Sequence, residues 1–437
     1  MEHTKAVERW VRDRNGRRRG TGAFGRIRLS AEQLLSSGGT TDSDEGNTER
    51  STDTNGRRRL AFYIPDLTTG GAEQVTVAIV NGLAARGHDV ELIVSDPKGR
   101  LGEKLSPDVT VSELGPMLPG LGIASHVPAL ARYLRRVRPA ILFPQMTHAG
   151  VVCLAASRLA SVDTVVVPVK HCAFGESSSR NPKDWALERL AIRLFPTANH
   201  VVGVSQGVVD SMVDRMSLDP AKTSVLHNPV DIDSIREQAA SPVDHEWIED
   251  DDLEVIVFVG RHEEQKDLET WLRAFTEVHE SNPNTRGVLV GMGSQRERLL
   301  ELAETLGVGE VVSFPGYVEN VYRYMSRSSV FMLSSRFEGL PTVLIEALAC
   351  GTQIVATDCP SGPREILLEG AEVCGRLAPV GDSSGLAKAV LETLQDPLPE
   401  AHLRQRATDF EPNAILDEYE RFIERQVGGV RGVSVAP

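Results

Sequence analysis

The sequence predicts an α/β fold with two Rossmann-like domains, and three observations support this prediction. From Leu60 onward, short β-rich runs alternate with amphipathic helical windows, which is the pattern of βαβ units in a parallel sheet. The alternation stops near residue 229 and restarts at Val255. A chain of 437 residues also exceeds two typical domains of about 150 residues, each large enough to bury its own core.

The first domain is expected over residues 60–229. Parallel strands must be joined by crossover connections, so strands and helices should alternate along the chain. The predicted strands are Leu60–Ile64, Val90–Val94, Ala140–Phe143, Thr164–Val169 and His200–Val204, and the predicted helices are Glu73–Arg86, His126–Arg138 and Lys183–Leu194.

The second domain is expected over residues 230–411, after a connection that extends from Pro229 to the acidic run Glu249–Asp252. A C-terminal segment, residues 412–437, contains the window Asn413–Val427, whose apolar residues have helical spacing and can pack on either domain. The predicted strands are Val255–Val259, Gly287–Val290, Val311–Phe314, Val330–Leu333 and Gln353–Ala356, and the predicted helices are Leu268–His279, Gln295–Leu306, Thr342–Ala349 and Ser384–Leu394.

Residues 1–59 are expected to form a disordered tail. Arginine clusters flank the stretch Ser36–Asn55, which is rich in Ser, Thr, Gly, Asp and Asn and has too little apolar content to form a core. The tail lacks the apolar segment of a signal peptide, so it does not indicate secretion.

Composition excludes several classes of function. The net charge of −14 argues against broad nucleic-acid binding, because neutralising phosphates requires a surplus of cations. No stretch approaches the roughly 20 apolar residues of a membrane span. The cysteines are odd in number and form no C-x-x-C pair, so a cytoplasmic location is expected rather than a disulfide framework or a zinc ribbon. They are Cys153, Cys172, Cys350, Cys359 and Cys374.

Loops that leave the carboxyl ends of parallel strands bind ligands in doubly wound folds, and four such loops carry suitable residues. In the first, Gly70 and Gly71 let the backbone approach a ligand, and the following helix offers free N–H donors to a phosphate. Taken alone, this loop fits a tight turn without a ligand equally well. In the second, Arg261 and Lys266 combine a forked donor with a point charge, which suits a diphosphate, and Asp267 is expected to cap the next helix.

The third loop and its helix contain Glu338 and Glu346, which lie up to about 12 Å apart along a helix. This exceeds the roughly 5–9.5 Å separation of a glycosidase acid–base pair, so separate tasks are expected. Glu346 lies in the apolar run Val343–Leu348 and therefore needs a polar partner, such as a ligand hydroxyl. The fourth candidate is His171 at a strand end, where a single histidine is more often structural than catalytic.

Together these motifs resemble the retaining glycosyltransferases of family 4, which have the GT-B fold. The resemblance covers residues 60–427, and the stretch from Cys359 to Glu365 is similar to that of members that build cell-surface or lipid-linked glycans. The motifs, in the family's order, are Gly-Gly-Ala-Glu at 70–73, Gly-Arg-x4-Lys-Asp at 260–267, Pro-Gly-Tyr at 315–317, Glu338-x7-Glu346 and Gly-Thr-Gln-Ile-Val-Ala-Thr-Asp at 351–358.

The resemblance implies two domains that face each other across a cleft, with a nucleotide-sugar donor on the second and a glycan or polyprenol-linked acceptor on the first. It implies transfer of a hexose or N-acetylhexosamine from a UDP-sugar. No cofactor or metal is expected, because Arg261, Lys266 and helix N-termini can offset the charge of the leaving diphosphate. Glu338 and His171 correspond to residues that contact the donor sugar and are the catalytic candidates. The residues that correspond to the donor-binding set are Gly70, Gly71, Arg261, Lys266, Tyr317, Val318, Gly339, Leu340, Pro341 and Glu346.

Other classes of protein share parts of this pattern. A nicotinamide dehydrogenase is disfavoured because Gly291-Met-Gly293 lacks the third glycine of the dinucleotide fingerprint. A metal-dependent transferase would need an Asp-x-Asp motif after a core strand, whereas Asp231-Ile-Asp233 lies in the expected connection. A nucleotide-sugar epimerase has the same architecture and remains the main alternative, and a sensor that binds the sugar nucleotide without reaction also remains open.

Contact with a membrane is a separate expectation. Arg132 and Arg136 accompany apolar residues on one predicted helix, and Trp185 and Arg189 lie on another. Either helix can lie on anionic lipid at the inner face of the cell membrane, and a solvated helix face is an equally good interpretation.

Overall fold

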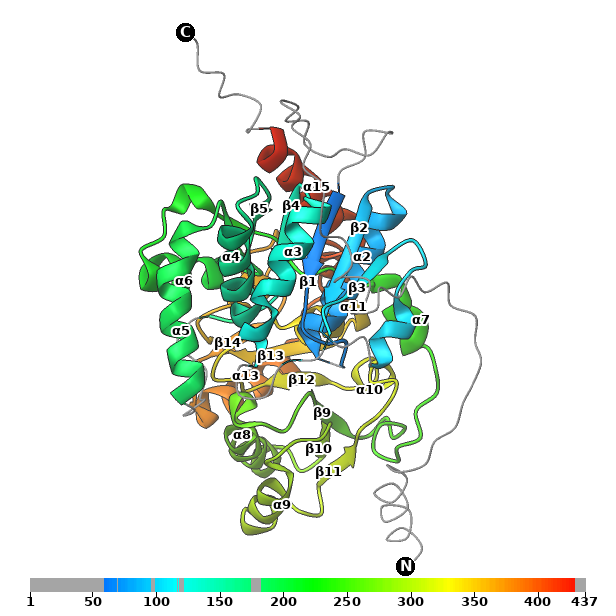
Figure 1. Ribbon diagram of the computed structural model, residues 1–437. Helices are drawn as coiled ribbons and strands as arrows, with labels where there is room; N and C mark the ends of the chain where they lie inside the picture. The colour runs from blue at the N-terminus through cyan, green and yellow to red at the C-terminus, as the bar shows by residue number, and fades with distance from the viewer. Residues whose placement is uncertain are drawn as a thin grey trace, which may run out of the picture. The chain divides into compact units, whose positions relative to one another are not determined.

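The computed structural model describes residues 59–68, 70–95, 99–115, 117, 122–173 and 182–428, excluding the side chains of residues 182–184. The expected tail therefore lies almost entirely outside the described residues. The described residues all belong to one compact unit. Within it, parallel strands build two separate sets of sheets with helices between most successive strands, which confirms the α/β prediction with two Rossmann-like domains (Figure 1).

The first domain contains a five-stranded parallel sheet in the order β3-β2-β1-β4-β5 and a three-stranded parallel sheet in the order β6-β7-β8. A parallel bridge between Gln145 and Val169 joins the two sheets beyond β4. The strands are β1 (Arg59–Tyr63), β2 (Asp89–Val94), β3 (Thr110–Glu113), β4 (Ile141–Pro144), β5 (Val165–Val166), β6 (Val169–Lys170), β7 (Val201–Gly203) and β8 (Thr223–Val225). The helices are α2 (Gly71–Ala85), α3 (Val127–Val137), α4 (Thr147–Ala160), α5 (Pro182–Leu194) and α6 (Gln206–Met216).

The second domain contains a six-stranded parallel sheet in the order β11-β10-β9-β12-β13-β14. Its strands are β9 (Glu254–Val259), β10 (Thr285–Val290), β11 (Val312–Gly316), β12 (Val330–Leu333), β13 (Gln353–Thr357) and β14 (Arg376–Ala378). Its helices are α8 (Leu268–Ser281), α9 (Arg296–Thr305), α10 (Tyr322–Met325), α11 (Thr342–Cys350), α12 (Pro363–Leu367), α13 (Ser383–Gln395) and α14 (Glu400–Thr408).

The cores follow from the sequence of the central strands. Leu60, Phe62 and Tyr63 of β1 are fully buried, and so are Ile256 and Phe258 of β9. Continuous apolar runs of this kind are required because helices cover both faces of a parallel sheet. Functional side chains are therefore expected in the loops that follow these strands and not within the strands themselves.

The prediction of a single strand over Thr164–Val169 was wrong. Strand β5 pairs with β4, Pro168 interrupts the ladder, and β6 begins after it to pair with β7, while a single bridge from Val169 to Gln145 keeps contact with the end of β4. Proline has no N–H to donate to a neighbouring strand, so it interrupts the ladder at this position. The side chains of Lys170 and His171 still bond to Thr147 and Gln145 beyond β4, while the carbonyl oxygen of His171 faces Gly339 of the second domain.

Several elements were not predicted, for identifiable reasons. Helix α4 is buried over most of its length, so it lacks the polar face that marks an amphipathic helix. Strand β3 is a polar edge strand without apolar alternation. The expected connection contains the eight-residue helix α7 (Ile232–Ala239), whose Asp231 side chain accepts the N–H of Ser234 at its start.

The C-terminal helix α15 (Pro412–Gly428) packs on the first domain. Arg86 at the end of α2 donates to Asp417 at 2.6 Å and to Glu420 at 2.9 Å. Gly82 is approached so closely by Leu416 that a Cβ atom would collide with it. In Figure 1 this helix, in red, lies beside the first strands of the chain, in blue.

Candidate functional site

The four loops singled out in the sequence lie together at the junction of the two domains. The loop after β12 meets the end of β6, and it also receives a hydrogen bond from Gln265 in the loop after β9. The loop before α2 approaches the loop after β9, since Arg261 acts electrostatically on Glu73. These contacts follow from parallel sheets, in which every strand presents its carboxyl end at the same edge.

Glu338 and Lys266 form a buried ion pair. Lys266 Nζ lies 2.5 Å from Glu338 Oε1, and the Ser335 hydroxyl donates to the same oxygen at 2.6 Å. The Glu338 residue is only 6% exposed, so its carboxylate depends on these donors for charge compensation. From the sequence, Lys266 was expected to bind a diphosphate and Glu338 a sugar. In the structure, the ammonium group of Lys266 and the carboxylate of Glu338 are in direct contact.

Glu346 occupies a different position from Glu338, on the second turn of α11. Burial raises the pKa of Glu346 to about 7, against the opposing effects of a hydrogen bond from Thr342 and the charge of Lys266. The neighbouring Tyr322 hydroxyl also has a raised pKa, because it is buried and lies near the Glu346 charge. A carboxyl group in this state gains from a ligand that donates hydrogen bonds to its ionised form.

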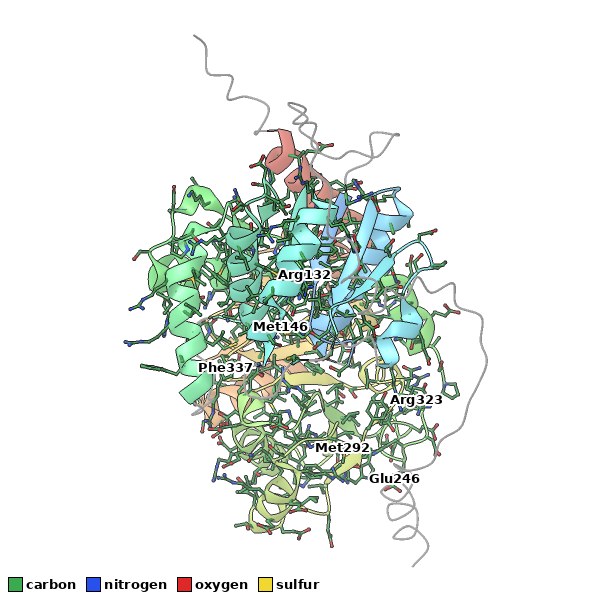
Figure 2. All side chains as sticks on the ribbon, viewed as in Figure 1. Arg132, Met146, Glu246, Met292, Arg323 and Phe337 are labelled. Atoms are coloured by element: carbon green, nitrogen blue, oxygen red, sulfur yellow. The ribbon has the colours of Figure 1, made fainter. Side chains whose placement is uncertain are left out.

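Gly339 brings the two domains into direct contact. A Cβ atom on Gly339 would collide with the carbonyl oxygen of His171, so only glycine fits between β12 and α11 at this point. The following residues, Leu340 and Pro341, are buried, and Pro341 is the N-cap of α11. Figure 2 marks Phe337, which precedes Glu338 in the same loop.

His171 is held by a residue that the sequence did not indicate. His171 Nε2 lies 2.9 Å from Oε1 of the fully buried Gln145, whose amide nitrogen in turn donates to Phe143 O at 3.4 Å. Since an amide oxygen only accepts, Nε2 carries the proton and Nδ1 keeps a lone pair. Burial and the charge of Lys170 lower the pKa of His171 to about 4, so the ring is neutral at physiological pH.

The loop before α2 presents a helix N-terminus. Gly70 is the N-cap of the 15-residue helix α2, and a Cβ atom on Gly71 would meet nothing within 4 Å. The carboxylate of Glu73 folds back against Gly70 at this helix end. Burial and the nearby Asp66 raise the pKa of Glu73, while Arg261 and its own backbone N–H oppose the rise. The helix end therefore offers N–H donors close to a cation of the second domain.

The remaining predicted residues lie at the ends of β9 and β11. Arg261 is exposed and follows Gly260 directly after β9. Tyr317 is 71% exposed after the left-handed Gly316, and Val318 packs against the core. An exposed aromatic ring beside a partly buried apolar neighbour is a suitable surface for a planar group.

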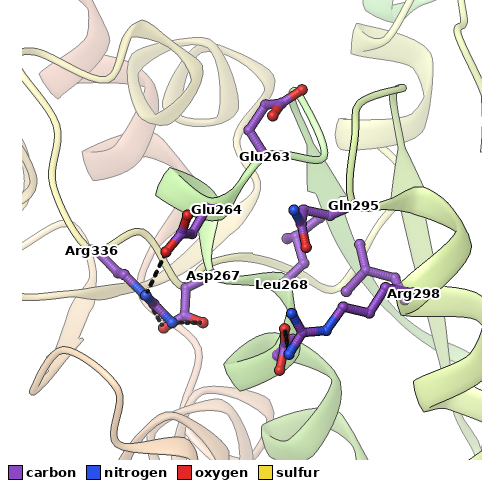
Figure 3. A pocket seen from close by; sticks show the side chains of 9 residues that line it. Glu263, Glu264, Asp267, Leu268, Gln295, Arg298 and Arg336 are labelled. Carbon is purple, nitrogen blue, oxygen red and sulfur yellow. Dashed lines mark hydrogen bonds and ion pairs between the residues drawn. The ribbon is translucent and has the colours of Figure 1, made fainter. Parts of the chain in front are cut away.

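Asp267 does not cap α8 as predicted. Its backbone is left-handed, and its side chain accepts from the Thr270 hydroxyl and pairs with Arg336 instead of binding the first N–H groups of the helix. Arg336 and Asp267 belong to a polar surface pocket of about 270 Å³, with Glu264 and Arg298 (Figure 3). Charged partners inside the pocket already engage these side chains, and Lys266 and Glu338 do not line it.

Two hydroxyl groups that the sequence analysis missed hold the loop of Gly339. The Ser205 hydroxyl, from the end of β7, donates to Gly339 O at 2.8 Å, and the Ser361 hydroxyl donates to Glu338 O at 2.6 Å. Ser205 and Gln145 both follow a strand at its carboxyl end, which was the signal available in the sequence. Neither stands in a recognisable motif.

The described part of the chain has neither a metal-binding cluster nor a membrane-spanning helix. No group of three or more His, Cys, Asp or Glu residues among the described residues is arranged to hold a metal ion. No helix in the described ranges is long and apolar enough to cross a membrane.

Two family models match the chain, one on each domain. The model described as "Glycosyltransferase Family 4" matches residues 69–234, and the model described as "Glycosyl transferases group 1" matches residues 243–410. The gap between the two matches, residues 235–242, lies inside the expected connection between the domains.

Curated relatives from Campylobacter jejuni subsp. jejuni serotype O:2 align over most of their length. An N-acetylgalactosamine-N,N'-diacetylbacillosaminyl-diphospho-undecaprenol 4-alpha-N-acetylgalactosaminyltransferase is 25% identical over 349 residues, covering 78% of this chain and 91% of the relative. A GalNAc-alpha-(1->4)-GalNAc-alpha-(1->3)-diNAcBac-PP-undecaprenol alpha-1,4-N-acetyl-D-galactosaminyltransferase is 27% identical over 382 residues, covering 84% and 98%.

Solved structures share the fold at low identity. Anabaena Alr3699/HepE in complex with UDP superimposes with a TM-score of 0.69 at 19% identity, covering 84% of this chain and 99% of that chain. The lipopolysaccharide outer core galactosyltransferase WaaB in its apo form superimposes with a TM-score of 0.66 at 17% identity, covering 85% and 99%.

Proposed function

The chain belongs to the GT-B glycosyltransferases of family 4, and on that premise we propose that it is a retaining transferase that moves a hexose or N-acetylhexosamine from a UDP-sugar to a polyprenol-linked or glycan acceptor. The observation that carries the proposal is the junction at Gly339. There the Lys266–Glu338 pair, the N-terminus of α11 and the neutral His171 come together from two domains.

Each group at the junction has a task that its chemistry supports. Arg261, Lys266 and the N-terminus of α2 at Gly70 and Gly71 bind the diphosphate and offset the charge that develops on it as the leaving group. Glu346 accepts the ribose hydroxyls. Tyr317 and Val318 hold the base, with the exposed Tyr317 ring as a surface for it.

The sugar itself lies between Glu338 and His171 in this proposal. The neutral imidazole and the backbone of Gly339, Leu340 and Pro341 bind sugar hydroxyls and the phosphate. The Glu338 carboxylate is engaged by Lys266 and Ser335, which makes it a poor nucleophile. We therefore favour front-face attack by the acceptor, assisted by the leaving phosphate, with retention of the anomeric configuration.

The identity of the donor and acceptor draws support from the relatives. Both Campylobacter relatives are named as N-acetylgalactosaminyltransferases of undecaprenol-linked glycans, and Alr3699/HepE was solved with UDP. A UDP-N-acetylhexosamine is thus the first donor to test. No cofactor or metal is part of the proposal, because cationic side chains and helix N-termini supply the positive charge.

A polyprenol-linked acceptor would bring the first domain to the membrane surface. Arg132 on α3 is exposed (Figure 2), and Trp185 on α5 is 58% exposed with the guanidinium of Arg189 over its ring at 4.3 Å. Exposed arginines with an aromatic ring suit the interface of an anionic bilayer. We propose a cytoplasmic enzyme that contacts the inner face of the cell membrane peripherally.

Transfer assays test the proposal directly. A panel of nucleotide sugars is first screened by thermal shift, because a donor that binds the folded state raises the melting temperature. The donors that bind are then incubated with and without polyprenol-diphosphate-linked saccharides, and the product anomer is determined by NMR. Acceptor-dependent release of UDP with a retained anomer supports the proposal. An inverted product contradicts the retaining mechanism, and isomerised sugar without acceptor would indicate an epimerase.

A further inference from the structure

A single buried hydroxyl connects the first domain to the donor loop of the second. Ser205 is fully buried, and its Oγ donates to Gly339 O at 2.8 Å across 134 residues of sequence. The same oxygen accepts the N–H of Val208 at 3.3 Å, so Ser205 is also the N-cap of α6. The donor loop is therefore fastened to the rigid start of an 11-residue helix in the other domain.

The backbone near Ser205 is shaped for this contact. A Cβ atom on Gly207 would lie 2.6 Å from Pro360 O, so α6 approaches the second domain as closely as glycine allows. The N–H of Gln206 donates to Glu365 at 2.8 Å in the same region. Three consecutive residues of the first domain thus contact the second, which fixes the position of the Ser205 hydroxyl.

Fixing the Gly339 carbonyl also fixes the direction of an N–H group. In a trans peptide the C=O of one residue and the N–H of the next point to opposite sides. Ser205 therefore orients the Leu340 N–H, and Ser361, which binds Glu338 O, orients the Gly339 N–H in the same way.

Those two N–H groups have no acceptor among the residues that the structure describes. Gly339 and Leu340 are buried residues, yet no group within the described ranges accepts a hydrogen bond from their backbone nitrogens. Buried backbone donors without partners are rare in folded proteins, and a ligand is one way to satisfy them. Both adjoin the N-terminus of α11, where an anion is favoured.

From this geometry we infer that Ser205 is a positioning residue of the transferase: it sets the Gly339–Leu340 peptide so that the Leu340 N–H faces the transferring sugar phosphate. The inference rests on the proposed function. The Ser205 hydroxyl touches neither substrate. Through this hydroxyl, the first domain helps to complete the donor site of the second domain. The site is complete only when the two domains are in contact.

Steady-state transfer kinetics test this role with four variants. Ser205→Ala removes the hydroxyl, and Ser205→Gly removes it while keeping a residue that is acceptable as an N-cap. Both should lower kcat about tenfold, the effect of about one hydrogen bond, and change the UDP dissociation constant less than threefold. Ser205→Thr keeps the hydroxyl and should restore kcat to within twofold.

The matched control is Ser328→Ala. Ser328 is 8% exposed and donates to Tyr324 O at 2.7 Å, so its loss also deletes a buried serine–carbonyl bond, away from the junction. Ser328→Ala should leave kcat unchanged. The inference is overturned if Ser205→Ala and Ser205→Gly keep the wild-type kcat, or if they slow the enzyme no more than Ser328→Ala does.

Amide hydrogen exchange supplies a readout that does not need turnover. Exchange over residues 336–345 should accelerate several-fold in Ser205→Ala and remain unchanged in Ser328→Ala and Ser205→Thr. Equal exchange in wild type and Ser205→Ala overturns the inference even if the transferase is active. Lack of transfer by the wild-type chain contradicts the proposed function instead, and the exchange result still decides the role of Ser205.

Discussion

His227 Nε2 lies 2.8 Å from Glu365 Oε1, and these residues come from the two different domains. His227 follows β8 where the chain leaves the first domain, and Glu365 lies on α12 of the second. Glu418 of α15 faces the other ring nitrogen at 3.7 Å, and the Phe410 ring packs edge-on. The imidazole of His227 therefore links three parts of the chain: the segment that leaves the first domain, the second domain, and the C-terminal helix.

We predict that the loss of this contact at alkaline pH lowers the stability of the fold. Burial alone lowers the pKa of His227, but hydrogen bonds to Glu365 and Glu418 outweigh it and raise the pKa to about 9. The folded state thus favours the protonated ring. The stabilisation is complete below the unfolded pKa of about 6.5 and is lost as the pH rises through 9.

Thermal unfolding from pH 6 to 10 measures this effect. His227→Gln should be less stable than wild type by on the order of 3 kcal/mol at pH 6, and the gap should close by pH 10. Substitution of the exposed His402 by Gln is the control and should have no effect at either pH. A gap that stays constant across the range would contradict the ionic role of His227.

The Lys266–Glu338 pair should dominate both stability and turnover at the junction. Lys266→Met leaves the buried carboxylate without its cation and should destabilise the fold by about 3–5 kcal/mol. Glu338→Gln should chiefly lower kcat, because contacts with the reacting sugar strengthen in the transition state. Urea unfolding of the single and double variants gives the coupling. Additive losses would show that the two charges do not interact.

Glu346→Gln should raise stability while weakening the donor site. Because the folded pKa of about 7 exceeds the ordinary 4.5, the carboxyl contributes stability below pH 4.5 that is lost as the pH rises to 7. At pH 8 the glutamine variant should gain on the order of 2–3 kcal/mol in the free protein, and at pH 4.5 it should match wild type. Its KM for the donor should rise, because donor binding loses about 1–3 kcal/mol of free energy, while kcat should stay at the wild-type value. Identical kcat losses in Glu346→Gln and Glu338→Gln would contradict the separate tasks.

Gly339→Ala should separate the donor loop from the first domain. The new methyl group would collide with the His171 carbonyl oxygen, which belongs to the backbone and cannot rotate away. We expect transfer to fall more than about 100-fold, as happens when reacting groups are displaced by about 1 Å. Gly428→Ala, at the end of α15 with nothing within 4 Å, is the control for adding a methyl group. Transfer within threefold of wild type in Gly339→Ala would refute the closed arrangement.

Turnover should not require a divalent metal. Arg261, Lys266 and the helix N-termini can stabilise the leaving diphosphate through charge and N–H donors. Transfer rates measured with EDTA should equal those without it. Activity that disappears with EDTA and returns with Mg²⁺ or Mn²⁺ would overturn the assignment of Arg261 and Lys266.

Much of the fold could be predicted because most strands and helices have a recognisable local pattern of apolar and polar residues. Apart from Thr164–Val169, the predicted strands and helices appear within about two residues of their expected positions, as β12 at Val330–Leu333 illustrates, whereas α6, α14, β8 and β14 are among the elements that were not predicted. The failures have local causes as well. Pro168 splits a strand whose apolar run continues through it, and α4 is too deeply buried to carry a polar face.

Residue patterns along the chain are enough to identify the loops that follow the carboxyl ends of strands. Gly71, Arg261, His171 and Glu338 were found in this way, since the rule needs only the local period and the order of elements. Which of these residues touch depends on the three-dimensional fold. Lys266 and Glu338 are 72 residues apart, and Ser205 and Gly339 are 134 apart. Contacts at such separations depend on strand order, on the glycine-sized gap at Gly339 and on how the domains close, and no residue period along the chain encodes them.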